Sequence, residues 1–86
     1  MYYVYILESV LKKRYYIGHT NNLDKRLLEH NSGKNRSTKA YAPWKIVYTE
    51  AVATKQEAYS REMRIKSYKG GRAFKNLIKD SVGGVA

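Results

Sequence analysis

The segment YYVYILESVLKKRYYIG, residues 2–18, decides the fold because two apolar runs lie close together in it. Tyr2–Leu7 and Arg14–Gly18 are rich in β-branched and aromatic residues, which predicts two strands. Only a short turn near Ser9–Lys13 separates them. We therefore expect the two strands to pair as an antiparallel hairpin.

The chain after this hairpin changes from strand to helical patterns. Polar residues 20–22 offer helix N-cap oxygens, and the leucines that follow predict a helix ending near Asn31. Residues 31–43 are basic, polar and without periodicity, which is typical of a surface loop. Residues 44–49 (WKIVYT) alternate well enough to predict a third strand.

The C-terminal part of the chain predicts two further helices. Thr54 and Glu57 match a capping box, so a helix should run from there to about Tyr68. A last short helix is predicted over Arg72–Asp80. The order β-β-α-β-α-α indicates an α+β fold with a three-stranded antiparallel-type sheet flanked by helices. We expect one domain over residues 1–80 and a frayed tail over residues 81–86.

Composition limits the classes of protein that this chain can form. Its 86 residues allow one domain, and the absence of cysteine excludes disulfides and thiol catalysis. No run approaches the ~20 apolar residues that cross a bilayer, and the N-terminal run does not resemble a signal peptide. We therefore expect a cytoplasmic protein with no membrane partner.

The charge of the chain suggests an anionic partner. Seventeen Lys and Arg against seven Asp and Glu leave a formal net charge of +10, spread along the whole sequence. Nucleic acid is the commonest partner of such a surface, because Lys and Arg neutralise its phosphates. The alternative is a basic protein that is merely soluble.

One acidic residue is out of place on the second long helix. At 100° per residue, Ala58, Tyr59, Met63 and Ile65 define an apolar arc, and Glu62 falls inside it. A carboxylate facing the core is costly unless it is paired or bound to a metal. It is either a rim glutamate paired with a nearby Lys or Arg, or a ligand for a divalent cation such as Mg²⁺.

The first helix and its flanks supply groups that suit a phosphate. Arg26 and His30 share one helix face at i and i+4, and an arginine can clamp a phosphate oxygen. His30 is open to a phosphate contact, to a proton relay or to neither role. His19 follows the second strand and projects toward the same region. The basic loop carries three residues suited to phosphate contact, namely Lys34, Arg36 and Lys39.

Residues 3–5 (YVY) followed by residues 16–18 (YIG) resemble the paired motifs of the GIY-YIG nuclease superfamily. Tyr3 stands where the family usually has Gly, and valine replaces the usual isoleucine after it. Arg26, ten residues after Tyr16, and the later Glu62 match the family pattern in order. The chain is most similar to small stand-alone bacterial members, which are compared with the nuclease domain of the excision-repair endonuclease.

The resemblance implies a role for each motif residue. Tyr5 and Tyr16 would line the active site, one of them helping to deprotonate the attacking water. Because free tyrosine has a pKa of ~10, that role needs a metal or another cation nearby. His19 would assist that tyrosine, Arg26 would steady the scissile phosphate, and Glu62 would hold a single divalent cation, Mg²⁺ or Mn²⁺.

Two more residues have counterparts in the family. His30 matches a histidine that recurs in the small members, and Asn76 is the nearest candidate for an asparagine that many relatives carry. The function implied is a metal-dependent endonuclease whose expected substrate is DNA rather than RNA, with repair as the pathway by analogy. A non-catalytic nucleic-acid-binding module is the alternative, and a protein-interaction domain is a third. A protein partner or a homodimer is left open.

Overall fold

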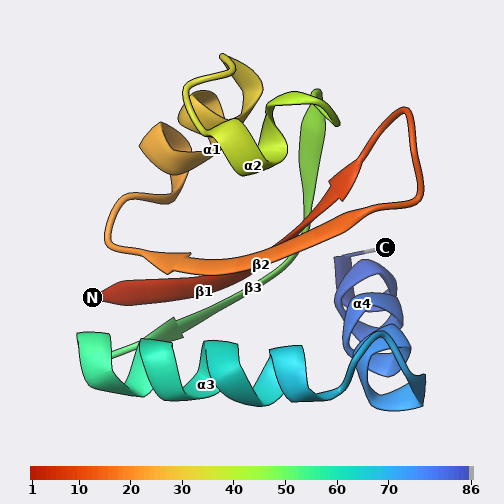
Figure 1. Ribbon diagram of the computed structural model, residues 1–86. Helices are drawn as coiled ribbons and strands as arrows, with labels where there is room; N and C mark the ends of the chain where they lie inside the picture. The colour runs from red at the N-terminus through yellow and green to blue at the C-terminus, as the bar shows by residue number, and fades with distance from the viewer. Residues whose placement is uncertain (86) are drawn as a thin grey trace.

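The computed structural model describes the backbone of residues 1–85 and the side chains of residues 1–79. A sheet of three strands separates two pairs of helices (Figure 1). The helices α1 (Leu23–Asn31) and α2 (Arg36–Lys39) lie over one face, and α3 (Lys55–Ser67) and α4 (Arg72–Val85) lie over the other. The α+β class and the predicted order of elements are confirmed.

The sheet has the order β2-β1-β3, so the first strand lies in its centre. The strands are β1 (Tyr2–Ser9), β2 (Tyr15–Thr20) and β3 (Trp44–Val52), and both pairings are antiparallel. The hairpin predicted from residues 2–18 is therefore confirmed. The third strand runs to Val52, beyond its predicted end at Thr49.

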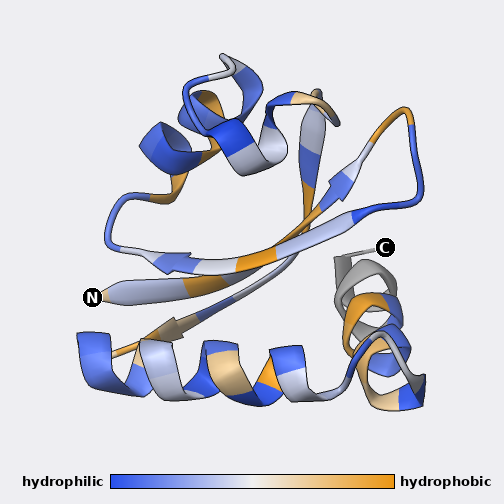
Figure 2. Ribbon diagram, viewed as in Figure 1, coloured by the Kyte–Doolittle hydropathy of each residue, from blue (hydrophilic) through white to orange (hydrophobic). Residues whose placement is uncertain are grey.

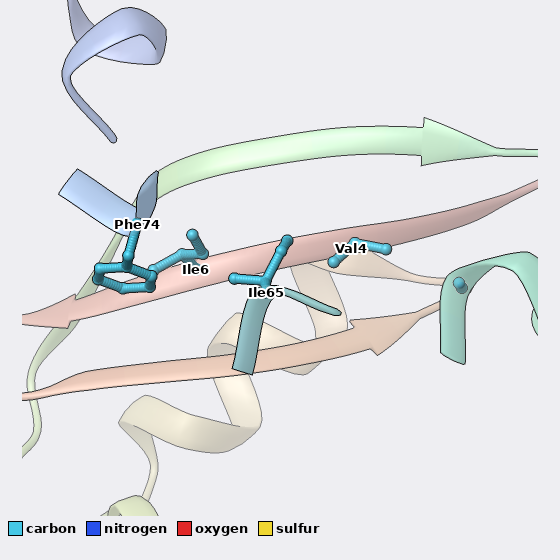
Figure 3. Packing of buried hydrophobic residues seen from close by; sticks show 5 residues of the cluster. Val4, Ile6, Ile65 and Phe74 are labelled. Carbon is cyan, nitrogen blue, oxygen red and sulfur yellow. The ribbon is translucent and has the colours of Figure 1, made fainter. Parts of the chain in front are cut away.

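The central strand divides its side chains between two hydrophobic clusters because successive residues point to opposite faces. Val4 and Ile6 pack with Ala58, Ile65 and Phe74 from the helices on the α3 face (Figure 3). On the α1 face lies the second cluster, made by Tyr5, Leu7 and Trp44. Hydrophobic colour in Figure 2 accordingly marks the middle of the strands, whereas much of α1 and α3 is hydrophilic.

Side chains cap the helices α1 and α3 as their sequences predict. The Oδ1 atom of Asn22 accepts a hydrogen bond of 3.1 Å from the Lys25 backbone N–H and begins α1. The Oγ1 atom of Thr54 accepts one of 3.1 Å from the Glu57 backbone N–H and begins α3. Such caps satisfy N–H groups that the first helical turn leaves without partners.

The segment predicted as a loop, residues 31–43, contains the short helix α2. The Oδ1 atom of Asn35 accepts hydrogen bonds from the backbone N–H and the hydroxyl of Ser37, which starts the turn. Thr38 is only 1% exposed, and its carbonyl accepts a hydrogen bond of 2.9 Å from the Trp44 indole N–H. Local polar hydrogen bonds, which leave no apolar periodicity in the sequence, therefore order this segment.

Two other predictions about helices need correction. Tyr59 and Met63 are 56% and 38% exposed, so they do not belong to the apolar arc of α3. The last helix continues to Val85 instead of ending at Asp80. The predicted tail over residues 81–86 is thus helical as far as Val85, and Ala86 lies outside the described residues. No helix in the described part of the chain is long and apolar enough to cross a membrane.

Candidate active site

Two tyrosine rings lie over a glycine on neighbouring strands. Gly18 of β2 is opposite Tyr5 of β1, and the rings of Tyr5 and Tyr16 have centroids 6.3 Å apart. A Cβ atom on Gly18 would lie 2.7 Å from the Tyr5 hydroxyl oxygen and 3.1 Å from the Tyr16 ring. The glycine therefore leaves the space that both rings occupy.

A buried histidine lies beneath these rings. His30 is wholly buried, and its Nε2 atom lies 3.1 Å from the Tyr5 hydroxyl oxygen. Its ring centroid is 4.6 Å from that of Tyr16, and its Nδ1 atom lies 2.9 Å from Oγ1 of Thr38. Burial lowers the pKa of His30, and the nearby cation of Arg26 lowers it further, so the ring is neutral at pH 7.

The two tyrosines differ in their exposure to solvent. Tyr5 is 1% exposed, and burial raises its pKa to about 12 even though the Arg26 guanidinium beside it acts in the opposite direction. Tyr5 therefore keeps its proton at neutral pH. Tyr16 is partly exposed beside it, so it is the more accessible of the two tyrosines.

Arg26 lies where two surface clefts meet. The first is lined by residues from β1, β2, the β2–α1 connection, α1 and the start of α3, namely Tyr2, His19, Thr20, Asn21, Asn22, Lys25, Arg26, Glu29 and Lys55. The second is lined by Arg26, Glu29, Lys34, Asn35 and Arg36. The Nη1 atom of Arg26 donates to Oε1 of Glu29 at 3.1 Å, and the adjacent Tyr5 hydroxyl raises the pKa of the guanidinium. A fixed cation therefore stands between two basic clefts.

Glu62 faces inward from α3, as its place in the sequence predicts. It is 8% exposed, and both of its carboxylate oxygens have partners. Oε1 lies 2.5 Å from Nδ1 of His19, and Oε2 accepts from Nζ of Lys66 at 2.6 Å. His19 in turn lines the first cleft together with Arg26, so Glu62 is connected to that cleft through the His19 ring.

The donor set limits the cation that this site could hold. Among the residues whose side chains are described, no group of three or more His, Cys, Asp and Glu could enclose a metal ion. A single carboxylate suits a cation such as Mg²⁺, which keeps several waters and takes oxygens from substrate phosphates. Glu62 fits that role provided that Lys66 shares or releases Oε2.

Comparison with known proteins identifies the family. The family model described as GIY-YIG catalytic domain matches residues 1–75. The chain belongs to the GIY-YIG family. A UPF0213 protein of Clostridium perfringens is 46% identical over 83 residues, covering 95% of this chain and 88% of that protein. Another, of Syntrophus aciditrophicus, is 46% identical over 82 residues, covering 92% of this chain and 91% of that one.

A solved structure supports the GIY-YIG fold. The solution structure of a UPF0213 protein from Bacillus halodurans has 34% sequence identity and a TM-score of 0.56, over 92% of this chain and 84% of that one. The names of these relatives state no activity. Membership of a nuclease family and its general link to nucleic acid are thereby shown, as the motifs around Tyr5 and Tyr16 imply.

The GIY-YIG fold brings most of the predicted site residues together. One group lies on the α1 face of the sheet and a pair lies at the β2 edge toward α3. The first group consists of Tyr5, Tyr16, Arg26 and His30, and the pair is His19 with Glu62. Lys34 and Arg36 line the second cleft beside Arg26, where a phosphate backbone could run.

Two predicted residues lie apart from this group. Asn76 is exposed on α4, which packs against β3 on the opposite face of the sheet from α1. Lys39 is exposed at the end of α2, and its aliphatic stem lies toward Gly33. Neither residue is among those that line the two clefts at Arg26.

Two residues that contact the site were not predicted. Thr38 lies in the segment taken for a loop, and Lys66 was assigned no role. The signal for Lys66 is its spacing of four residues from Glu62, which places the two side chains on one helix face. The signal for Thr38 is weaker, since Asn35 and Ser37 mark only the start of a short helical turn.

Proposed function

We propose that this GIY-YIG protein is a metal-dependent endonuclease that hydrolyses phosphodiester bonds of nucleic acid, with DNA as the expected substrate. The observation that carries the proposal is that Arg26 lies beside Tyr5 and lines a cleft with His19, whose Nδ1 atom lies 2.5 Å from the inward carboxylate of Glu62. An arginine can bind a phosphate, a phenol can take part in activating water, and a carboxylate can hold a cation, and these are three tasks of phosphodiester hydrolysis.

The geometry supports a division of labour in this reaction. Arg26 would bind the scissile phosphate between the two clefts and offset the charge that develops on its oxygens. Tyr16, the more accessible tyrosine, would accept a proton from the attacking water after its own phenolic proton has passed to solvent, and the leaving oxygen would take a proton from water. Glu62 would hold one Mg²⁺ or Mn²⁺, whose charge would neutralise phosphate oxygens.

The His19–Glu62 pair favours this division. The contact between Nδ1 of His19 and Oε1 of Glu62 at 2.5 Å fixes one oxygen of the carboxylate. Nε2 of the same ring is then free of that contact, and His19 lines the cleft that Arg26 also lines. His19 is therefore placed to orient Glu62 and to face substrate.

One observation favours the second candidate, a nucleic-acid-binding module without cleavage. Lys66 pairs with Oε2 of Glu62 at 2.6 Å, so a structural ion pair accounts for the inward carboxylate without any metal. The basic clefts around Arg26 would then bind a phosphate backbone and nothing more. Cytoplasmic location and a protein partner or homodimer stay predictions.

Cleavage assays separate the two functions. The purified protein is incubated with branched, single-stranded and duplex DNA and with RNA, in Mg²⁺, in Mn²⁺ and in chelator. We expect cation-dependent cutting that Glu62→Gln, Tyr16→Phe and Arg26→Gln abolish. Glu8→Gln is the matched control, because Glu8 lies beside the β1–β2 turn and pairs with Lys45. Salt-sensitive binding without cutting on every substrate would reject the endonuclease in favour of the binding module.

A further inference from the structure

A chain of hydrogen bonds runs through the interior from α2 to the central strand. Oγ1 of Thr38 lies 3.3 Å from the carbonyl oxygen of Asn35 and 2.9 Å from Nδ1 of His30. Nε2 of His30 lies 3.1 Å from the Tyr5 hydroxyl oxygen. Tyr5, His30 and Thr38 are each no more than 1% exposed, so water does not compete for these bonds.

The direction of the chain follows from counting protons. Thr38 has one hydroxyl proton and donates it to the Asn35 carbonyl, which can only accept. Oγ1 of Thr38 must then accept from His30, which requires the proton of the neutral imidazole on Nδ1. Nε2 is left as an acceptor, so it receives the Tyr5 hydroxyl proton.

The opposite direction fails at Tyr5. If Thr38 donated to His30, the Asn35 carbonyl would still accept from the backbone N–H groups of Thr38 and Lys39, but Nε2–H would donate to the Tyr5 oxygen. The Tyr5 proton would then point away from His30 toward the Arg26 guanidinium, which carries only donors. The Tyr5 O–H and the Arg26 N–H groups would then face each other as two donors in a buried site and repel. With the His30 proton on Nδ1, the Tyr5 oxygen instead presents its lone pairs to Arg26.

We propose that Thr38 is a positioning residue, which fixes His30 in the Nδ1–H form and thereby aims the lone pairs of the Tyr5 hydroxyl at Arg26. Tyr5 in this arrangement is a fixed acceptor that orients the phosphate-binding guanidinium. It is not the base that takes a proton from water, which leaves that task to Tyr16. The consequence for catalysis rests on the proposed endonuclease function, but the protonation of His30 does not.

The orientation also ties two parts of the site together. Thr38 belongs to α2, whose first residue Arg36 lines the second cleft with Lys34. Its carbonyl accepts from the Trp44 indole at 2.9 Å, so α2 is anchored to β3 as well. The short helix thus supplies a cleft residue on its outside and the end of the Tyr5 hydrogen-bond chain on its inside.

Nuclear magnetic resonance tests the proposal without any substrate. Long-range ¹H–¹⁵N correlations of the two histidines show which ring nitrogen carries the proton, and His19→Gln assigns the His30 signals by elimination. We expect His30 to be the neutral Nδ1–H form in the wild type and in Thr38→Ser. In Thr38→Val, which removes the acceptor, we expect the Nε2–H form to become populated. An Nε2–H form in the wild type, or an unchanged form in Thr38→Val, would overturn the proposal.

Kinetics test the consequence separately. Thr38→Val should lower kcat by about tenfold with little change in KM, because a misoriented Arg26 costs more in the transition state than in binding. Thr38→Ser should restore the wild-type rate. If wild-type protein cuts no substrate, the endonuclease function fails while the NMR result stands. If Thr38→Val does not fold, the wild-type tautomer and Thr38→Ser still decide the orientation.

Discussion

The Nζ atom of Lys66 lies 2.6 Å from Oε2 of Glu62, one helical turn away on α3. The contact joins a half-exposed lysine to a carboxylate that is nearly buried. Any divalent cation that binds Glu62 must therefore compete with a positive charge held on the same helix.

Replacing this lysine should strengthen cation binding at Glu62. Because the Lys66 side chain is 47% exposed, solvent screens the pair, and we expect Lys66→Met to tighten Mn²⁺ binding only about fivefold, or ~1 kcal/mol. Water-proton relaxation in the presence of Mn²⁺ measures the affinity. Lys75→Met, at an exposed position of α4, is the matched control, and Glu62→Gln should abolish the site. Equal or weaker affinity in Lys66→Met would show that the lysine does not compete.

A methyl group at Gly18 should disturb the tyrosine pair. Its carbon would lie 2.7 Å from the Tyr5 hydroxyl oxygen, so we expect Gly18→Ala to lower the free energy of unfolding by ~1–3 kcal/mol. Urea denaturation followed by circular dichroism gives this value.

A double-mutant cycle with Tyr5→Phe tests the cause, since removing the hydroxyl relieves part of the clash. If Gly18→Ala lowers the free energy of unfolding as much in the Tyr5→Phe background as in the wild type, contact with the Tyr5 hydroxyl is not the reason that position 18 requires glycine.

Stability should decrease in mild acid because of His30. Burial and then Arg26 lower its pKa in the folded protein, so protonation favours the unfolded chain. The stability that neutral His30 contributes is fully present above its pKa in the unfolded chain, ~6.5, and is lost as pH falls through its lower pKa in the folded protein.

Urea unfolding at pH 7.5, 6.5 and 5.5 should show this loss in the wild type and a smaller one in His30→Gln. Because His19 is present in both proteins, its effect cancels in the difference. Parallel pH curves for the two proteins would mean that His30 does not titrate differently on folding.

Basic residues beside Arg26 should set the salt dependence of nucleic-acid binding. Lys34 and Arg36 line the second cleft, so Lys34→Gln with Arg36→Gln should reduce the slope of log affinity against log salt by about 2 for duplex DNA. Fluorescence anisotropy over a series of salt concentrations measures the slope. The control is Lys12→Gln with Lys13→Gln, in the exposed β1–β2 turn. This variant loses the same two positive charges as the cleft variant, and we expect it to change the slope less. Equal effects of the two pairs would indicate diffuse attraction rather than a defined cleft.

The regular elements could be predicted because their patterns are local. The strand runs around Tyr5 and Tyr16 and the caps at Asn22 and Thr54 each depend on neighbours in sequence. The inward position of Glu62 could be predicted from helical spacing alone, even though the apolar arc drawn around it included two exposed residues, Tyr59 and Met63.

The contacts within the site depend on distant residues and could not be predicted in this way. His30 was open to several roles, and only packing shows it wholly buried between Tyr5 and Thr38. No local sequence pattern predicted that Thr38 is buried, because its burial follows from the contact of α2 with Trp44. Asn76 was chosen by approximate spacing, and the path of α4 takes it to the other face of the sheet.

The alternation of side chains along β1 has a consequence for folding. Val4 and Ile6 fill the core under α3 and α4, while Tyr5, between them in sequence, reaches His30 on the other face. A slip of one residue in the pairing with β2 would turn all of these side chains over, burying the tyrosine hydroxyl among aliphatic groups. A misregistered chain would lose both hydrophobic clusters and the contact between Tyr5 and His30 in one step. Correct pairing of β1 with β2 is thus a precondition of the candidate site as well as of the core.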